Sequence, residues 1–572
     1  MKANDTTIKA LIEGVKQFVI PVYQRTFAWN PDERKTKAMT VEKMWIDIRD
    51  LLDGEERDTH FFGSIVTMPA LSSASEVSKF IVIDGQQRLI STSLLLAAIR
   101  DVAKNANMQE GNNTHFVEKL EEGFLLNRLR DGEEKYKVVP TKSDKEYYFS
   151  IVDGVDSTAI SNQKIVRAFK YFLGKVQEGI DEMSDPVEKG KKLDRIQNVL
   201  LNRLRIVDVK LDQDDDPHDV FESLNYTGIP LSNWDLVRNY ILMHYKDPKI
   251  QEEKYSTLVR KVEDNIESKE EEFLRDYIGM NGKVTTSRNI YNSFKNLMPN
   301  SNVGGTLSPD WGNSINELVA VSEIYRTLIN PNEIKHPTIR EWINFTIERL
   351  KMTTHFPVLM KLFKMHSEGS ININQLSTSV KMVASYLLRR TLAFNSQGLN
   401  KFFPGIAAAL TVDPEAYLRD TLTKGFFAAP DNRRFIEILR QEEVGYYNVE
   451  IVKYLLYRLE KSVNKEVPAL EKLQLEHIMP QTLDEDWKDN LGPEWERIHR
   501  EFVNKLGNLT LTGYNQELQN FSFAKKKSNK NGYSNSSLKI TRELASYNNW
   551  GEQEITKRGE ELSARIAGMW VI

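Results

Sequence analysis

Three regions with different hydrophobic patterns follow one another along the chain. Up to about residue 244, short apolar runs alternate with helical periodicity, as in an α/β domain. Residues 245–465 place apolar side chains at three- and four-residue spacing, which is typical of packed helices. From residue 466 the pattern returns to strands, loops and helices. A chain of 572 residues is too long for one core, so we predict an α+β multidomain protein with domains at 1–244, 245–465 and 466–572.

An Asp-Gly turn joins a predicted buried strand to a predicted helix in the first region. The strand is the apolar run 80–83, and the helix follows over 89–99. A helix N-terminus offers N–H groups and a favourable dipole to a phosphate, and Gly85 allows close approach. Arg88 could grip phosphate oxygens and Asp84 could hold Mg²⁺. The pentapeptide Asp-Gly-Gln-Gln-Arg by itself is more typical of a turn whose arginine forms a surface ion pair.

A second polar motif lies in the last region, where a strand is predicted over 473–479. Glu476 and His477 stand near its end, a second strand is predicted directly after Asn508, and Asn515 lies at a predicted helix start. A neutral histidine can activate water, and carboxylate and amide oxygens suit Mg²⁺ or Mn²⁺. Together these groups are suited to phosphodiester hydrolysis. The competing interpretation is a hydrogen-bonded core histidine with turn-forming asparagines.

Composition narrows the classes of site and partner. The chain has no cysteine, which excludes disulfides, zinc-thiolate sites and cysteine nucleophiles. Net charge is −4, but residues 500–545 carry eight Lys and Arg against three Glu, a local charge of +5. This segment, with Lys525, Lys526 and Lys527, is predicted to face DNA, although charge alone also describes a solvated surface. The N-terminus has no signal-peptide pattern and no apolar run spans a bilayer, so we expect a cytoplasmic protein without a membrane partner.

The two motifs together resemble the GmrSD-type restriction enzymes, which are modification-dependent (type IV) enzymes. The first region is similar to their ParB-like nucleotide-binding and nucleotide-hydrolysing N-terminal domain, and the last to their C-terminal HNH (ββα-metal) nuclease domain. The middle region resembles the family loosely around Tyr386–Arg390. The residues that carry the two stronger likenesses are Asp84–Arg88, Phe221–Asn225 and Arg238–Tyr240, then Glu476–Pro480, Gly507–Leu511 and Asn515.

The resemblance implies roles for individual residues. In the nuclease domain, His477 would be the general base, Asn508 would brace the loop, Asn515 would help to hold the metal, and Glu476 would be a further metal ligand. His477 and Asn508 lie 31 residues apart, further than in compact HNH domains, so the fold of residues 481–505 is left open. The nucleotide site implied in the N-terminal domain consists of Gln24, Arg25, Asp84, Gly85, Gln86, Gln87, Arg88 and Asn225. No Walker A motif occurs, so the nucleotide site is not a P-loop.

The implied function is restriction of phage double-stranded DNA that carries modified bases, such as glucosylated hydroxymethylcytosine, with a nucleoside triphosphate gating the cut. A homodimer is expected because a double-strand cut needs two nuclease sites. The alternatives are an enzyme that senses phosphorothioate and nicks DNA, and a ParB-like, nucleotide-switched DNA-binding protein that does not cut. An RNA-cutting effector is a third class, but no RNA-reading motif is visible.

Overall fold

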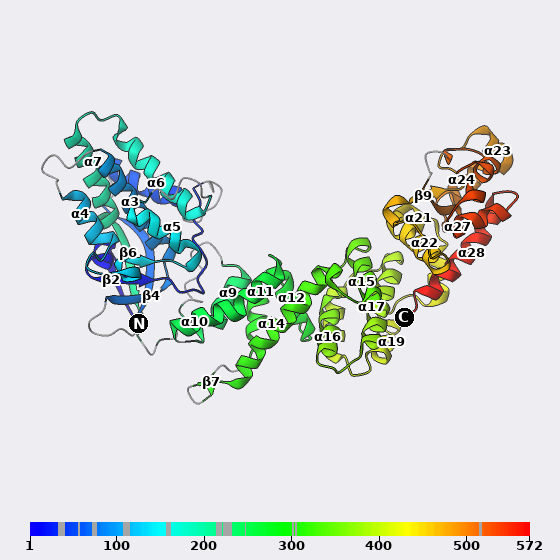
Figure 1. Cartoon of the computed structure of the whole chain (residues 1–572), viewed down its shortest axis with the longest axis horizontal. Helices are drawn as coiled ribbons and strands as arrows, with labels where there is room; N and C mark the ends of the chain where they lie inside the picture. Colours follow the sequence, from blue (N-terminus) through cyan, green and yellow to red (C-terminus); the bar gives the residue numbers. More distant parts are fainter. Residues whose placement is uncertain are drawn as a thin grey trace. The chain divides into compact units, whose positions relative to one another are not determined.

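The computed structural model describes residues 1–31, 40–54, 58–70, 77–106, 115–155, 162–212, 215, 220, 231–245, 247–299, 302–303, 306–513 and 518–572. They form two compact units (Figure 1). One unit consists of Met1–Lys261 and Pro299–Asn316, and the other of Val262–Met298 and Glu317–Ile572. Most helices of the predicted middle region therefore lie in the same unit as the C-terminal strands, and its boundary at residue 465 stays a prediction.

A mixed six-stranded sheet forms the centre of the first unit. Its strand order is β1-β6-β3-β4-β2-β5. Strand β2 runs parallel to both β4 and β5, and β3 runs parallel to β6, whereas the β1–β6 and β3–β4 pairs are antiparallel. The α/β character predicted for this region is confirmed. The strands are β1 (Lys2–Thr7), β2 (Lys16–Val19), β3 (His60–Pro69), β4 (Ser78–Asp84), β5 (Val138–Val139) and β6 (Leu204–Lys210).

Helix α3 (Gln86–Asn105) starts directly after β4 and is buried on almost every side. Its apolar stretch from Leu94 to Ile99 is covered by other helices, above all α6 (Lys164–Asp181). The strand and helix predicted around the Asp-Gly turn are both confirmed. The helix begins earlier than predicted because Gly85, at φ 93°, turns the chain into it in the left-handed region that favours glycine.

Ser232 and Asp235 form a capping box. The Ser232 hydroxyl accepts a hydrogen bond from Asp235 N at 3.1 Å, and Ser232 N donates to Asp235 Oδ2 at 3.1 Å. This box starts helix α9 (Asn233–Met243). The other helices of the first unit include α1 (Ile8–Ile12), α2 (Val41–Asp53), α4 (Phe116–Leu120), α5 (Lys142–Asp153), α7 (Pro186–Asn198) and α10 (Pro248–Lys254).

Helices fill the second unit as far as residue 463. Residues 339–365 have the apolar spacing of one long helix but form two helices. Helix α15 (Pro337–Asn344) continues into the π-helical turn η7 (Phe345–Arg349), and α16 (Phe356–Ser367) begins after a break. Lys351 has φ 55°, which ends the first helix, and Pro357 fits only the first turn of the second. Further helices include α12 (Glu270–Met280), α17 (Ile373–Leu392), α18 (Leu399–Ala409), α19 (Pro414–Thr423), α20 (Asn432–Leu439), α21 (Glu442–Tyr447) and α22 (Val449–Val463).

The end of the second unit holds the predicted pair of strands. Strand β9 (Gln474–His477) pairs antiparallel with β10 (Leu509–Thr512), and α26 (Phe523–Ser528) follows. The connection left open by the sequence folds into two short helices, α23 (Glu485–Leu491) and α24 (Trp495–Phe502), and the 3₁₀ turn η9 (Leu506–Asn508). The last helix of the chain is α28 (Glu552–Met569), which buries Ile555, Leu562 and Ile566. No helix in the described parts of the chain combines the length and the apolar character needed to span a membrane.

Candidate active site

His477 ends strand β9, opposite Leu509 of β10. Its Nε2 lies 3.2 Å from Asn504 Oδ1. An amide oxygen only accepts, so Nε2 donates and Nδ1 carries the lone pair that can take a proton. Burial lowers the pKa of His477, and the positive charges of Lys526 and His499 lower it further, while the bond to Asn504 opposes them. The imidazole is therefore neutral near pH 7, as a general base must be.

Asn508 is fully buried, and its side chain forms hydrogen bonds with three separate segments of the chain. Its Oδ1 accepts from Met479 N at 2.8 Å and from Trp550 Nε1 at 3.0 Å. Its Nδ2 donates to the carbonyls of Met479 and Val503, each at 2.8 Å. Asn508 is 0% exposed, and the four hydrogen bonds of its side chain are all made to other parts of the protein. This is the arrangement of a residue that braces the loop.

Replacing Asn508 with alanine is expected to lower the free energy of unfolding of the second unit by about 3 kcal/mol, since buried partners of the lost amide are left unsatisfied. Guanidinium unfolding followed by tryptophan fluorescence measures the change. Asn490→Ala is the matched control, because Asn490 is exposed and its side chain donates to the Asp486 carbonyl. Equal stability of the two variants would contradict the bracing role.

Glu476 lies in the interior, away from the histidine beside it. Adjacent residues of a strand point to opposite faces of the sheet. The Oε1 of Glu476 accepts from Lys526 Nζ at 2.6 Å and from Tyr533 Oη at 3.1 Å, and Lys526 also donates to the His477 carbonyl at 2.9 Å. Lys526 is 0% exposed. The structure therefore does not support the predicted contact of Lys526 with DNA, and it places Glu476 in an ion pair rather than at an open metal position.

The other two lysines of the run lie nearer the surface. Lys525 is exposed and pairs with Asp486 at 3.3 Å, and Lys527 donates to the Tyr547 carbonyl at 2.8 Å. Asn515, the predicted metal ligand, lies outside the described residues, as does Asn225 of the predicted nucleotide site. Within the described residues, no three His, Asp or Glu side chains come together as a metal site would require.

Two glutamines of the predicted nucleotide site hold the segment 20–29 against the start of α3. Gln24 donates to the Ile83 carbonyl at 2.7 Å. Gln87 Oε1 accepts from Ala28 N at 2.8 Å, and Gln87 Nε2 lies 3.4 Å from the Thr26 carbonyl. Gln86 is also buried, and its Oε1 has no hydrogen-bond partner among the described residues. The aromatic segment and the Asp-Gly turn thus form one site although some 60 residues of sequence separate them, as the contacts of Gln24 and Gln87 show.

Arg88 connects the start of α3 to strand β3. It donates to the carbonyls of Phe62 at 2.9 Å and Ser64 at 3.0 Å. Gly63, at φ 122°, makes room for it, because a Cβ there would come within 2.5 Å of the Arg88 Nε. The Arg88 guanidinium is thus engaged by backbone carbonyls of the protein.

Asp84 and Arg25 lie in a mostly buried cluster of charges. Asp84 is 3.9 Å from Arg88, and burial raises the pKa of its carboxyl, against the opposing charges of Arg88 and Arg25. Burial lowers the pKa of Arg25, and the carboxylates of Asp235 and Asp84 oppose that shift. Asp235 in turn pairs with Arg238 at 2.5 Å, and Arg238 donates to the Tyr23 carbonyl at 3.1 Å. Neither Asp235 nor Arg238 is among the residues predicted for the nucleotide site, and in the sequence Arg238 carries only a family likeness.

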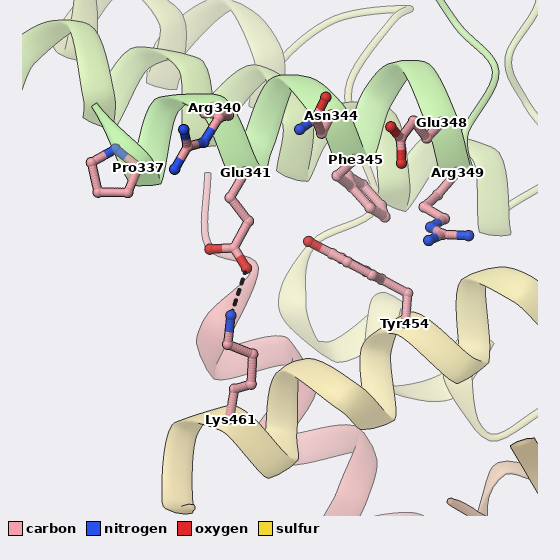
Figure 2. A pocket seen from close by; sticks show the side chains of 9 residues that line it. All are labelled: Pro337, Arg340, Glu341, Asn344, Phe345, Glu348, Arg349, Tyr454 and Lys461. Carbon is pink, nitrogen blue, oxygen red and sulfur yellow. Dashed lines mark ion pairs between the residues drawn. The ribbon is translucent and has the colours of Figure 1, made fainter. Parts of the chain in front are cut away.

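A hollow in the helical part of the second unit has a different character. Figure 2 shows a groove between α15–η7 and α22, with a volume of about 310 Å³. Its lining holds both signs of charge: Arg340, Arg349 and Lys461 against Glu341 and Glu348. Glu341 lies 3.6 Å from Lys461, and the ring centres of Phe345 and Tyr454 lie 4.9 Å apart. A DNA-binding groove needs a larger excess of basic residues than this.

Comparison with protein families identifies the class of the chain. Residues 429–565, which hold His477 and its loop, match the C-terminal domain model of a restriction endonuclease family, and residues 8–242 match the N-terminal domain model of the same family. The two matches together cover more than half of the chain, which is therefore a restriction endonuclease with DNA as its substrate. Both models describe the GmrSD restriction endonucleases, and the chain belongs to that family. No curated protein matches it.

Proposed function

We propose that this restriction endonuclease is an HNH-type enzyme that cuts modified foreign DNA under the control of a nucleoside triphosphate. The observation that carries the proposal is the environment of His477 at the end of the antiparallel strand pair β9–β10. Its imidazole is neutral, Asn504 orients the ring, and Nδ1 is left to take a proton. The order of β9, β10 and α26 agrees with a ββα nuclease motif. In this proposal Nδ1 takes a proton from the attacking water as the phosphodiester is cleaved.

A divalent cation, Mg²⁺ or Mn²⁺, is part of the proposal. The described residues around His477 offer no free carboxylate, because Glu476 is paired with Lys526, so they do not complete a metal site by themselves. Asn515, with water and the DNA phosphate, would hold the ion, and Mg²⁺ commonly keeps several waters. Bound there, the ion would stabilise negative charge on the phosphate oxygens.

The pH dependence of cleavage tests the role of His477. Its lowered pKa keeps the base neutral further into the acid range, so kcat/KM should fall only below the ordinary histidine value of about 6.5. Asn504→Ala removes a hydrogen bond that favours the protonated ring, so the acid limb should move to lower pH while kcat falls. Two results would contradict His477 as the base: an acid limb of the kcat/KM profile that does not move in Asn504→Ala, or a midpoint of that limb above pH 7 in the wild type.

A nucleotide site at the start of α3 is the second part of the proposal. No side chain caps this helix N-terminus, the Gln86 Oε1 has no partner among the described residues, and Arg25 and Asp84 lie beside it. A triphosphate would place its oxygens against the N–H groups of the first turn and against Arg25. The proposal includes hydrolysis of the nucleotide and, because both DNA strands are cut, a homodimer.

Asp84 would hold the Mg²⁺ of the bound nucleotide, so Asp84→Asn is expected to weaken binding of a fluorescent nucleoside triphosphate with Mg²⁺ by about tenfold or more. It should also remove the effect of nucleotide on cleavage, while nucleotide-independent cleavage persists. The control is Asp5→Asn, an exposed aspartate of the same sheet that pairs with Arg205. The test uses matched modified, phosphorothioate and unmodified phage DNAs with Mg²⁺ and each triphosphate. Hydrolysis of nucleotide and binding of DNA without any cut by the wild type would favour a nucleotide-switched binding protein instead.

A further inference from the structure

Three aromatic side chains are grouped on the surface of the second unit. Phe394, Tyr446 and Tyr447 are 63%, 63% and 67% exposed. The rings of Tyr446 and Tyr447 lie 4.8 Å apart, and those of Phe394 and Tyr447 lie 6.1 Å apart. We call these three residues the aromatic cluster. Grouped exposed aromatic rings mark a surface that another molecule covers, because leaving them in water is unfavourable.

The backbone at Phe394 supports a functional reason for the cluster. Phe394 follows α17 with φ 53°, the left-handed conformation in which glycine or asparagine usually ends a helix. A bulky aromatic residue there is strained, and its side chain packs into no core that would repay the strain. Such outliers gather at sites of function.

The aromatic cluster adjoins the loop that orients His477. Helix α21, which carries both tyrosines, packs against η9. The contact is tight: a Cβ on Gly445 would come within 1.8 Å of the Asn504 carbonyl oxygen. Asn504 is the residue whose side chain accepts from His477. Tyr446 is therefore the residue directly after the one that contacts this loop.

A cationic side chain follows Asn504 in the loop that Gly445 contacts. The ammonium of Lys505 lies 4.0 Å from the centre of the ring of Phe502, which is buried and is not part of the aromatic cluster. Exposed aromatic rings beside a cation are the combination by which proteins hold single nucleic-acid strands, with rings stacked on bases and cations near phosphates. The chemistry of the cluster thus fits a nucleic-acid strand better than an apolar protein face.

We infer that the aromatic cluster stacks on unpaired bases of the DNA strand whose phosphate lies at His477. The inference rests on the proposed role of His477 and adds a binding site to it. Stacking would hold the strand beside the scissile phosphate and would require locally opened DNA. It would act through the π-faces of the bases and so would be tolerant of sequence.

DNA binding by cleavage-deficient protein tests the inference. In a His477→Ala background, Tyr446→Ala and Tyr447→Ala are expected to weaken binding of a fluorescein-labelled single-stranded oligonucleotide by about 5- to 150-fold each, the range for loss of one stacked base. Tyr446→Phe and Tyr447→Phe should bind like the parent because they keep the ring. Phe426→Ala is the matched control: Phe426 is 90% exposed and its ring contacts Phe427.

Oligonucleotides with single abasic positions identify the bases involved. At a stacked position, the losses of binding free energy from removing the base and from removing the tyrosine ring should not add, because both changes delete the same contact. Unchanged binding by both alanine variants would overturn the inference, as would full additivity at every abasic position. A change of oligomeric state on light scattering with DNA binding intact would also overturn it and would make the cluster a self-association surface. Binding does not require cleavage, so failure of the proposed nuclease mechanism would be seen separately.

Discussion

His477→Ala is expected to reduce cleavage by about 10²- to 10⁴-fold in kcat, the usual contribution of a general base, with little change in DNA affinity. The variant should fold normally, because His477 is only partly buried and its side chain donates a hydrogen bond to Asn504. Single-turnover cleavage of labelled phage DNA with Mg²⁺ gives the rate, and anisotropy gives the affinity.

The control for this prediction is His499→Ala. His499 is the other histidine of the last region, and its Nε2 lies 2.9 Å from the Pro480 carbonyl oxygen. The exchange should cost much less activity than His477→Ala. The result that contradicts the proposal is the reverse order, in which His499→Ala stops cleavage and His477→Ala does not.

Lys526→Met is expected to destabilise the second unit by about 3–5 kcal/mol, because it leaves the Glu476 carboxylate buried without its cation. The double variant Glu476→Gln, Lys526→Met should recover part of that loss, since no charge then remains buried. Denaturant unfolding of the single and double variants measures both effects. A single variant as stable as the wild type would show that the ion pair does not hold β9 to α26.

Lys525→Met is the matched control one residue away. Lys525 is 63% exposed and its pair with Asp486 is also exposed, so its loss should change stability by less than about 1 kcal/mol. If Lys525 contacts a phosphate, Lys525→Met should instead weaken DNA binding. The slope of the logarithm of the binding constant against the logarithm of salt concentration should then become shallower by about one. The two neighbouring lysines then separate a structural role from a binding role.

The local pattern was enough to predict several elements of the fold. The apolar run before Asp84 and the periodicity after it predicted β4 and α3, because a buried strand and a buried helix have hydrophobic signatures that do not depend on distant residues. The same holds for the strands around His477 and Asn508. The motifs in these elements also predicted the family, which the domain matches confirm.

Other features depend on contacts between residues far apart in sequence, which no local pattern encodes. Asn504 becomes the partner of His477 only because α23 and α24 fold the connection back onto β9. Likewise, only tertiary packing shows that Lys526 is interior while Lys525 is exposed, although the run reads as uniform charge. The sequence by itself determined which polar residues could do chemistry. The tertiary structure decided which of them are neutralised by buried partners, because the free energy of a charge depends on its surroundings and not on its neighbours in the chain.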